Sequence, residues 1–196
     1  AATRFDLLRT SDLRTPMRAQ AGLRYLDHGC GHLDEAMDVP DWLREADGSV
    51  SLAALLILAD STLAAAVATT LAVDRVPVTR RFSLEPVGRS PVRATGLVTS
   101  AHVVHADDRQ ATVRADVRAD GELVAVASMR TAIVPDRGGP DARPPDGADR
   151  LARPPSLAAA WPLEPVDGPG ADGAVVVRTP APPWQANSIG TLHGGA

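Results

Sequence analysis

Asp60 is the residue whose type and position most suggest chemistry, because it is the one charged side chain in an apolar run over residues 50–73. Such a carboxylate either reaches the edge of its element, where a cap or an arginine satisfies it, or acts as a catalytic acid or base, because burial makes its pKa tunable. The residues alone leave both interpretations open. Ser61 and Thr62 follow Asp60 and could bond its carboxylate or a substrate, although helical Ser and Thr commonly bond their own backbone.

The apolar run that carries Asp60 predicts a helix buried on every side. Leu, Ala and Ile dominate residues 50–73, and Gly and Pro are absent. A bilayer helix would carry a central Asp at a cost of about 3 kcal/mol, and four strand-like runs follow directly. We therefore expect a protein core around this helix, no membrane, and Ser49 or Ser51 as its N-cap.

The rest of the first 134 residues predicts a sheet around the helix. A short peripheral helix is expected within residues 3–20, and an extended pair of strands within 22–38. After the helix the pattern changes to the two-residue alternation of half-buried strands, and Asp120-Gly121 is typical of a type I′ hairpin turn. The predicted fold class is α+β, a sheet curled around one helix. The expected strands span residues 78–87, 92–105, 110–119 and 122–134.

His28, Cys30 and His32 would share one face of a strand at a spacing of two residues. A metal ion favours such ligand types, but no second pair of ligands stands elsewhere in the sequence. We therefore expect a structural or solvent-facing role for these three residues, and no metal.

Composition restricts the class of partner. The net charge is −4 and no basic cluster occurs, which argues against nucleic acid. The single cysteine, Cys30, excludes an intrachain disulfide and fits a reducing cytoplasm. The first residues lack the apolar core of a signal peptide.

Two segments of the chain share one pattern. Trp42-x5-Gly48-x2-Ser51 and Trp184-x5-Gly190-x2-His193 have identical spacing, and two of the three tryptophans match. Coincidence among common residues is the alternative to a repeat. A repeat would place His193 at the start of a second central helix, and we expect that the protein extends beyond a motif that ends at residue 196. The predicted domains are residues 1–134 and 157–196, joined by a Pro- and Gly-rich linker over 135–156.

These residues resemble the hotdog-fold acyl-CoA thioesterases of the phenylacetate-pathway type. The similar segments are LAALLILADSTLAAAV, RRFSLEPV and the strands that follow, and the string from Asn187 to Gly195 looks like the opening of the same motif in a second copy. The family motif is His-Gly-Gly, six residues, then Asp. Asp60 falls on the catalytic acid position, nine residues after Ser51, while Ser51-Leu52-Ala53 replaces His-Gly-Gly. The resemblance implies a tandem hotdog protein whose second copy is truncated.

The resemblance also implies a composite site. In that family a Gly N–H at a helix N-terminus polarises the thioester carbonyl, and the helix Asp of the facing protomer attacks it or activates water. Here Asp60 would work with His193 and Gly194, with Asn187 as an orienting group, through a homo-oligomer or an internal pseudo-dimer. The partner would be acyl-CoA, with no cofactor.

Arginines beside the first strands after the helix are candidates for the phosphates of CoA, and Ser61 and Thr62 for other contacts with the substrate. For any single arginine, a solvated charge at a strand edge is the simpler interpretation. The arginines are Arg80, Arg81, Arg89 and Arg93.

Two other functions remain open. The replaced His-Gly-Gly favours a non-catalytic hotdog protein that binds acyl-CoA or acts as a scaffold. An enoyl hydratase is a weaker alternative, because that branch resembles an Asp-x4-His arrangement and no His follows Asp60 in the helix.

Overall fold

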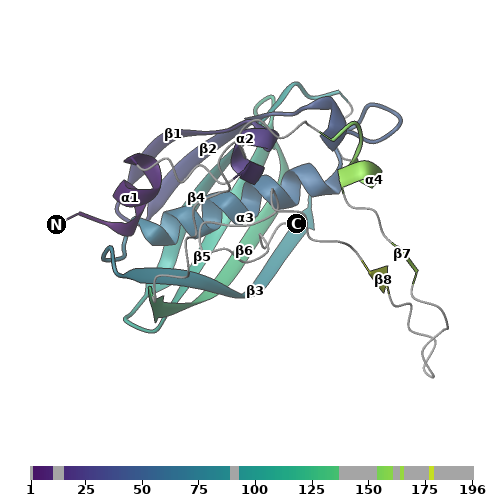
Figure 1. Cartoon of the computed structure of the whole chain (residues 1–196). Coiled ribbons are helices and arrows are strands. Elements are labelled where there is room, and N and C mark those ends of the chain that lie inside the picture. The colour runs from purple at the N-terminus through teal and green to yellow at the C-terminus, as the bar shows by residue number, and fades with distance from the viewer. Residues whose placement is uncertain are drawn as a thin grey trace.

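A computed structural model describes the part of the chain that contains the predicted helix and strands. Its first helix pair and its six-stranded sheet surround one long helix, α3 (Figure 1). No helix among the described residues combines the length and the apolar character needed to cross a membrane. The described residues are 2–10, 16–88, 93–136, 154–160, 164–165 and 177–178.

The central helix α3 spans Leu52–Ala68, inside the predicted apolar run. The Ser51 side chain caps it by accepting a hydrogen bond from the Ala54 N–H at 3.2 Å, which confirms one of the two predicted caps. At the other end the Thr69 hydroxyl donates to the Ala66 carbonyl at 2.6 Å, which adds to the backbone hydrogen bonds of the last turn. Thirteen of its 17 residues are buried, so the helix is enclosed by the core as expected.

Six antiparallel strands form one sheet in the order β1-β2-β4-β5-β6-β3. The two-residue alternation therefore predicted the strands correctly, with ends that differ by a few residues. Within this sheet β3 is an edge strand, with β6 as its one neighbour. The strands are β1 (Leu23–Gly29), β2 (His32–Asp38), β3 (Arg75–Pro86), β4 (Gly96–Ala106), β5 (Gln110–Ala119) and β6 (Glu122–Pro135).

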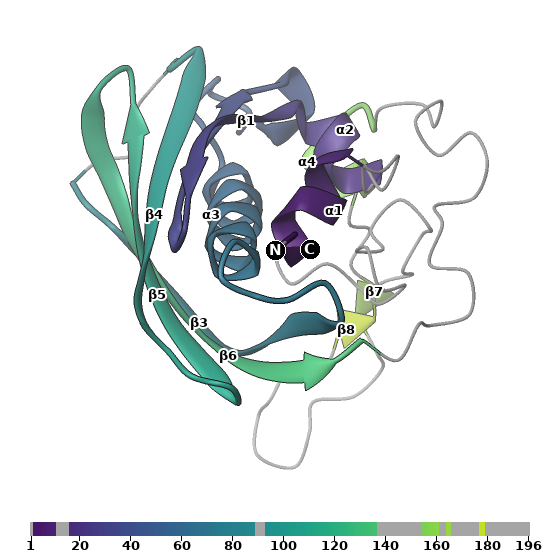
Figure 2. The same ribbon diagram turned by 90° about the vertical axis from the view of Figure 1, so that its left-hand side faces the viewer.

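The sheet curls because its strands are bent by irregularities in their pairing. The register shifts once in each of four strand pairs, at points such as Thr79/Arg81 and Val103/His105, and β-bulges of this kind bend a strand and increase its twist. The β5–β6 turn has positive φ at both Asp120 (48°) and Gly121 (89°), as a type I′ turn requires. Figure 2 shows the resulting concave sheet with α3 in its hollow. The predicted α+β fold, a curled sheet around a helix, is confirmed.

The N-terminal segment lies on the side of α3 that faces away from the sheet (Figure 2). It forms two helices, α1 (Arg4–Thr10) and α2 (Pro16–Ala21), where one was predicted. The prediction of a peripheral helix was also wrong, because Phe5 and Met17 are fully buried members of the core. Arg4 ties α1 to the end of the sheet by an ion pair with Asp136 at 2.5 Å.

The shared face predicted for His28, Cys30 and His32 was also wrong. His28 of β1 is exposed but pairs with the core residue Leu33, and its ring lies 4.8 Å from that of Phe5 between centroids, tilted by 45°. Cys30 lies exposed in the turn, and His32 begins β2. The spacing of two assumed one continuous strand, whereas the chain reverses between Gly29 and His32.

The remaining described elements are short, and most of residues 137–196 lies outside the described part of the chain. That part contains the predicted linker and nearly all of the predicted second repeat, which therefore stay predictions, as do the domain boundaries. The short elements are the 3-10 helix η1 (Asp41–Leu43), α4 (Leu157–Ala160), β7 (Glu164–Pro165) and β8 (Val177–Arg178).

Candidate active site

Asp60 lies in the middle of α3 with only 6% of its surface exposed. Its neighbours one turn away on the same face, Leu56 and Ala64, are half-buried, whereas the remaining faces of the helix are fully buried. Asp60 therefore stands on the one face of the central helix that solvent approaches. A nearly buried carboxylate beside partly exposed positions of the helix is a candidate for chemistry.

The start of α3 differs from a Gly-rich helix N-terminus that would hold an anion. The Ser51 side chain is fully buried and is already engaged as the helix cap. Leu52 is 52% exposed, so a bulky side chain stands where a glycine would leave the backbone bare. The loop that leads into this helix is held by Arg44, which donates to the carbonyl of Ala94 at 2.9 Å and to that of Val39 at 3.2 Å.

A second carboxylate, Glu35 of β2, lies next to the helix segment that follows Asp60. It is completely buried. The hydroxyl of Thr62 lies 3.0 Å from Glu35 Oε2 and 2.7 Å from the Leu58 carbonyl, so this side chain bridges the helix backbone and the carboxylate. Sequence reasoning missed Glu35, although a signal existed. In β2 the alternation places Glu35 on the same face as the fully buried residues Leu33 and Met37.

Arg18 of α2 compensates the buried charge of Glu35. Its Nη1 atom lies 2.5 Å from Glu35 Oε1, an ion-pair contact that is not aligned as a hydrogen bond. The same nitrogen donates to Ser61 Oγ at 2.6 Å, and the guanidinium lies 4.0 Å from the centre of the Tyr25 ring. A buried carboxylate is tolerated only with such a partner. We call Arg18, Glu35, Ser61, Thr62 and Tyr25 the buried polar cluster.

Burial raises the pKa of Tyr25 to about 12, although the positive charge of Arg18 opposes this shift and the negative charge of Glu35 adds to it. The phenol is therefore protonated at neutral pH, and its ring gives the Arg18 guanidinium an uncharged surface. The cluster fixes Ser61 and Thr62, which follow Asp60 directly. In the described structure Ser61 is held by Arg18, and Thr62 by Glu35 and the Leu58 carbonyl; their contacts with a substrate stay a prediction.

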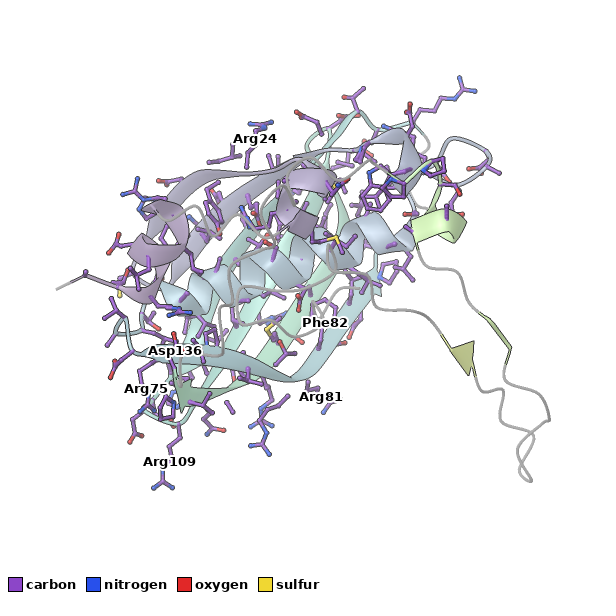
Figure 3. The ribbon with its side chains drawn as sticks, viewed as in Figure 1. Arg24, Arg75, Arg81, Phe82, Arg109 and Asp136 are labelled. Carbon is purple, nitrogen blue, oxygen red and sulfur yellow. The ribbon has the colours of Figure 1, made fainter. Side chains whose placement is uncertain are left out.

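Three of the four predicted phosphate-binding arginines are described, and all three are exposed. Arg80 and Arg81 are exposed on β3, and Arg81 extends away from α3, whereas Phe82 lies on the side facing the helix (Figure 3). Arg81 stands directly opposite the exposed Arg130 of β6 in the strand register. Arg93 is exposed in a loop with a positive φ of 66°. Four other candidates, Arg89, Asn187, His193 and Gly194, lie outside the described residues.

No protein-family model and no curated protein matches the sequence. Solved structures do resemble it. A conserved protein of Pseudomonas aeruginosa is 27% identical, with a TM-score of 0.56 over 62% of this chain and 98% of that one. A mutant of a phenylacetic acid degradation protein of Thermus thermophilus is 25% identical, with a TM-score of 0.54 over 60% of this chain and 97% of that one.

A thioesterase of Haemophilus influenzae has a TM-score of 0.58 over 67% of this chain and 87% of that one, at 15% identity, and so shares the fold alone. Together these similarities support the hotdog fold. In each comparison about one third or more of this chain lies outside the matched region.

Proposed function

We propose that this protein is a thioesterase that hydrolyses acyl-CoA, with Asp60 as the base or nucleophile. The observation that carries the proposal is the position of Asp60, nearly buried on the single approachable face of the central helix in a fold that thioesterases share. Hydrolysis of a thioester needs a group that activates water or attacks the carbonyl carbon, and a carboxylate shielded from bulk water is suited to both tasks.

In the simpler route the Asp60 carboxylate takes a proton from water as the oxygen of that water bonds to the thioester carbon. The carbonyl oxygen becomes an oxyanion, which backbone N–H groups at a helix N-terminus stabilise. The tetrahedral intermediate then breaks its C–S bond. Asp60 passes the proton that it took from water to the leaving thiolate of CoA. The acyl group is released as the free carboxylic acid. No redox step or cofactor is needed.

The oxyanion donors would come from outside the first hotdog unit. The α3 N-terminus of this unit is capped by Ser51 and carries the exposed Leu52, so it lacks the bare backbone that the reaction requires. Asn187, His193 and Gly194 supply that turn in our proposal. They would face Asp60 in a pseudo-dimer within one chain or in a homo-oligomer, for which the edge strand β3 offers an unpaired side within the six-stranded sheet.

Arg80 and Arg81 are proposed to hold the phosphates of CoA at the exposed edge of the sheet, on β3. The juxtaposition of Arg81 and Arg130 supports this role, because two like charges directly opposite each other repel unless an anion lies between them. Ser61 and Thr62 then act mainly through the buried polar cluster, by holding the helix turn beside Asp60.

The test is the substitution Asp60→Asn in a chain that includes both motifs, assayed by thiol release from short, long and aromatic acyl-CoAs. We expect kcat to fall by about 10²-fold or more, since positioned acid–base groups contribute this much. Asp116→Asn, a carboxylate on β5 whose side chain is 49% exposed, is the control and should keep full activity. Turnover by Asp60→Asn equal to that of the unchanged protein would rule out the assignment.

A non-catalytic acyl-CoA-binding protein is the second candidate. The observation that favours it is the start of α3, where a buried capping serine and an exposed leucine stand at the family's His-Gly-Gly position. This candidate predicts saturable binding of acyl-CoA with no release of thiol from any acyl chain. The thiol-release panel, run beside calorimetric binding of the same acyl-CoAs, separates the two functions.

A further inference from the structure

Three potential metal ligands meet on the β1–β2 hairpin, which borders the sheet beside α1 (Figure 1). Asp27, His32 and Asp34 each offer a ligand atom, and these atoms all lie within 4.8 Å of one another. Leu33 and Glu35 face the core, so His32 and Asp34, which alternate with them, face outward. The group is therefore on the opposite face of the sheet from Asp60 and α3.

A β-bulge brings Asp27 to this face. Tyr25 pairs with Glu35, but the next pair is Asp27 with Asp34, which leaves Leu26 as an extra residue in β1. In a regular strand Asp27, two residues after the inward-facing Tyr25, would lie on the core side. Bulges commonly re-aim a side chain in this way. The result is two carboxylates directly opposite each other, an arrangement that destabilises a strand pair when nothing neutralises it. Arg24, a nearby positive charge on the same strand, forms its ion pair with Asp38 and not with these two carboxylates.

The distance between His32 and Asp34 matches that between two ligands of one ion. His32 Nε2 lies 3.4 Å from Asp34 Oδ1. Two ligand atoms bound at about 2.0–2.1 Å to one tetrahedral ion are about 3.4 Å apart. Asp34 Oδ1 is also shielded from solvent and accepts no hydrogen bond. A cation would therefore satisfy an acceptor that the protein leaves unsatisfied.

The hairpin that carries the ligands is held from two sides. The Gly31 N–H donates to Thr69 Oγ1 at 2.8 Å, and the Val103 N–H donates to the Gly31 carbonyl at 2.8 Å. Gly31 has a φ of 75°, which favours glycine at this turn. Ligands on a fixed hairpin lose little conformational entropy when they bind an ion.

We propose that Asp27, His32 and Asp34 form a binding site for a divalent transition-metal ion, with Zn²⁺ as the best match. One imidazole and two carboxylates suit Zn²⁺, whereas Mg²⁺ and Ca²⁺ prefer ligand sets made only of oxygen. Three protein ligands leave the fourth tetrahedral position to water. This metal site and the proposed thioesterase site have no residue in common, so each can be tested without the other.

The test is calorimetric titration of Zn²⁺ into the full chain, prepared without a histidine tag and in a Cys30→Ser background that removes the exposed thiol of the hairpin turn. One ion per chain is expected. His32→Ala and Asp27→Asn should each weaken binding at least tenfold, and millimolar Mg²⁺ should not compete. These side chains are partly or fully exposed, so circular dichroism should show unchanged folding.

A second His–Asp pair in the sheet provides the matched control. His105 Nε2 lies 3.6 Å from Asp107 Oδ2, again at a spacing of two residues, but Thr112 rather than a carboxylate stands opposite His105. His105→Ala should leave Zn²⁺ affinity unchanged. The proposal is overturned if no Zn²⁺ binds below about 100 μM, or if His32→Ala and Asp27→Asn bind as tightly as the His105→Ala control.

Discussion

Removal of the Arg18 guanidinium should destabilise the protein far more than removal of an ordinary surface arginine. In Arg18→Met the apolar stem is kept, while Glu35 stays completely buried and loses its counter-charge. Breaking one side of a buried pair costs about 3–5 kcal/mol. Arg18 has only 15% of its side chain exposed, so solvent does little to weaken the effect. Glu35→Gln keeps an acceptor for Thr62 and should cost less, about 1–3 kcal/mol.

The double variant separates the ion pair from simple loss of packing. In Arg18→Met/Glu35→Gln no uncompensated charge remains. The loss of unfolding free energy in this double variant should therefore be smaller than the sum of the two single losses by about 2 kcal/mol or more. The assay is urea unfolding at pH 7 and 25 °C, with the slope against urea checked for constancy. Arg24→Met is the matched control. Arg24 Nη2 lies 3.2 Å from Oδ1 of Asp38, whose side chain is 79% exposed. The loss of unfolding free energy in Arg24→Met should therefore stay below about 1 kcal/mol.

Two results would refute this reasoning. The first is a coupling energy under about 0.5 kcal/mol between Arg18 and Glu35, which would mean that the pair is screened by solvent. The second is equal destabilisation by Arg18→Met and Arg24→Met. Either result would also remove the structural basis for fixing Ser61 and Thr62 beside Asp60.

Three further perturbations test local features of the fold. Gly121→Ala should cost about 1 kcal/mol in thermal or urea unfolding because its φ is 89°, whereas Gly29→Ala, which has open space around its Cβ position and no positive φ, should not; equal effects would contradict the turn assignment. Ser51→Ala removes the cap of α3 and should cost about 1–2 kcal/mol; no change in the urea midpoint would contradict it. The pKa of Asp107 is lowered mainly by the backbone N–H of Arg109 and then by that of Gln110, so its contribution to stability is present above the ordinary Asp pKa and is lost as pH falls below about 4. The difference in unfolding free energy between Asp107→Asn and the unchanged protein should be constant from pH 7 to about pH 5 and shrink at lower pH; a difference that grew on acidification would contradict the shift.

Elements that follow from local periodicity were predictable from the sequence. The helix at Leu52–Ala68 and the alternation in β3 to β6 depend on residues close together in the chain, and the Asp120-Gly121 turn depends on two. The α+β fold, a sheet curled around a helix, and the nearly buried position of Asp60 followed from those elements, whereas the hotdog fold was implied by the family resemblance. The boundaries moved by a few residues, since strand ends are decided by pairing with neighbours.

The N-terminal segment shows where periodicity was insufficient. Its helices are short, and short helices gain their stability from tertiary packing rather than from propensity. Phe5 and Met17 could not be recognised as core residues, because the surface that buries them is built by α3 and β1, which come later in the chain. Arg18 was therefore not recognised as the partner of a residue 17 positions away in β2.

The sequence by itself determined the central helix, the strands, the family resemblance and the location of one carboxylate in an apolar helix. Only the tertiary structure decided which other charges meet. Glu35 and Arg18 converge beside Ser61 because β2 and α2 pack on α3 from different sides. Asp27 joins His32 and Asp34 because one extra residue in β1 changes the face on which it lies. Such contacts depend on register and packing between distant segments, and the alternation within a single segment does not specify either.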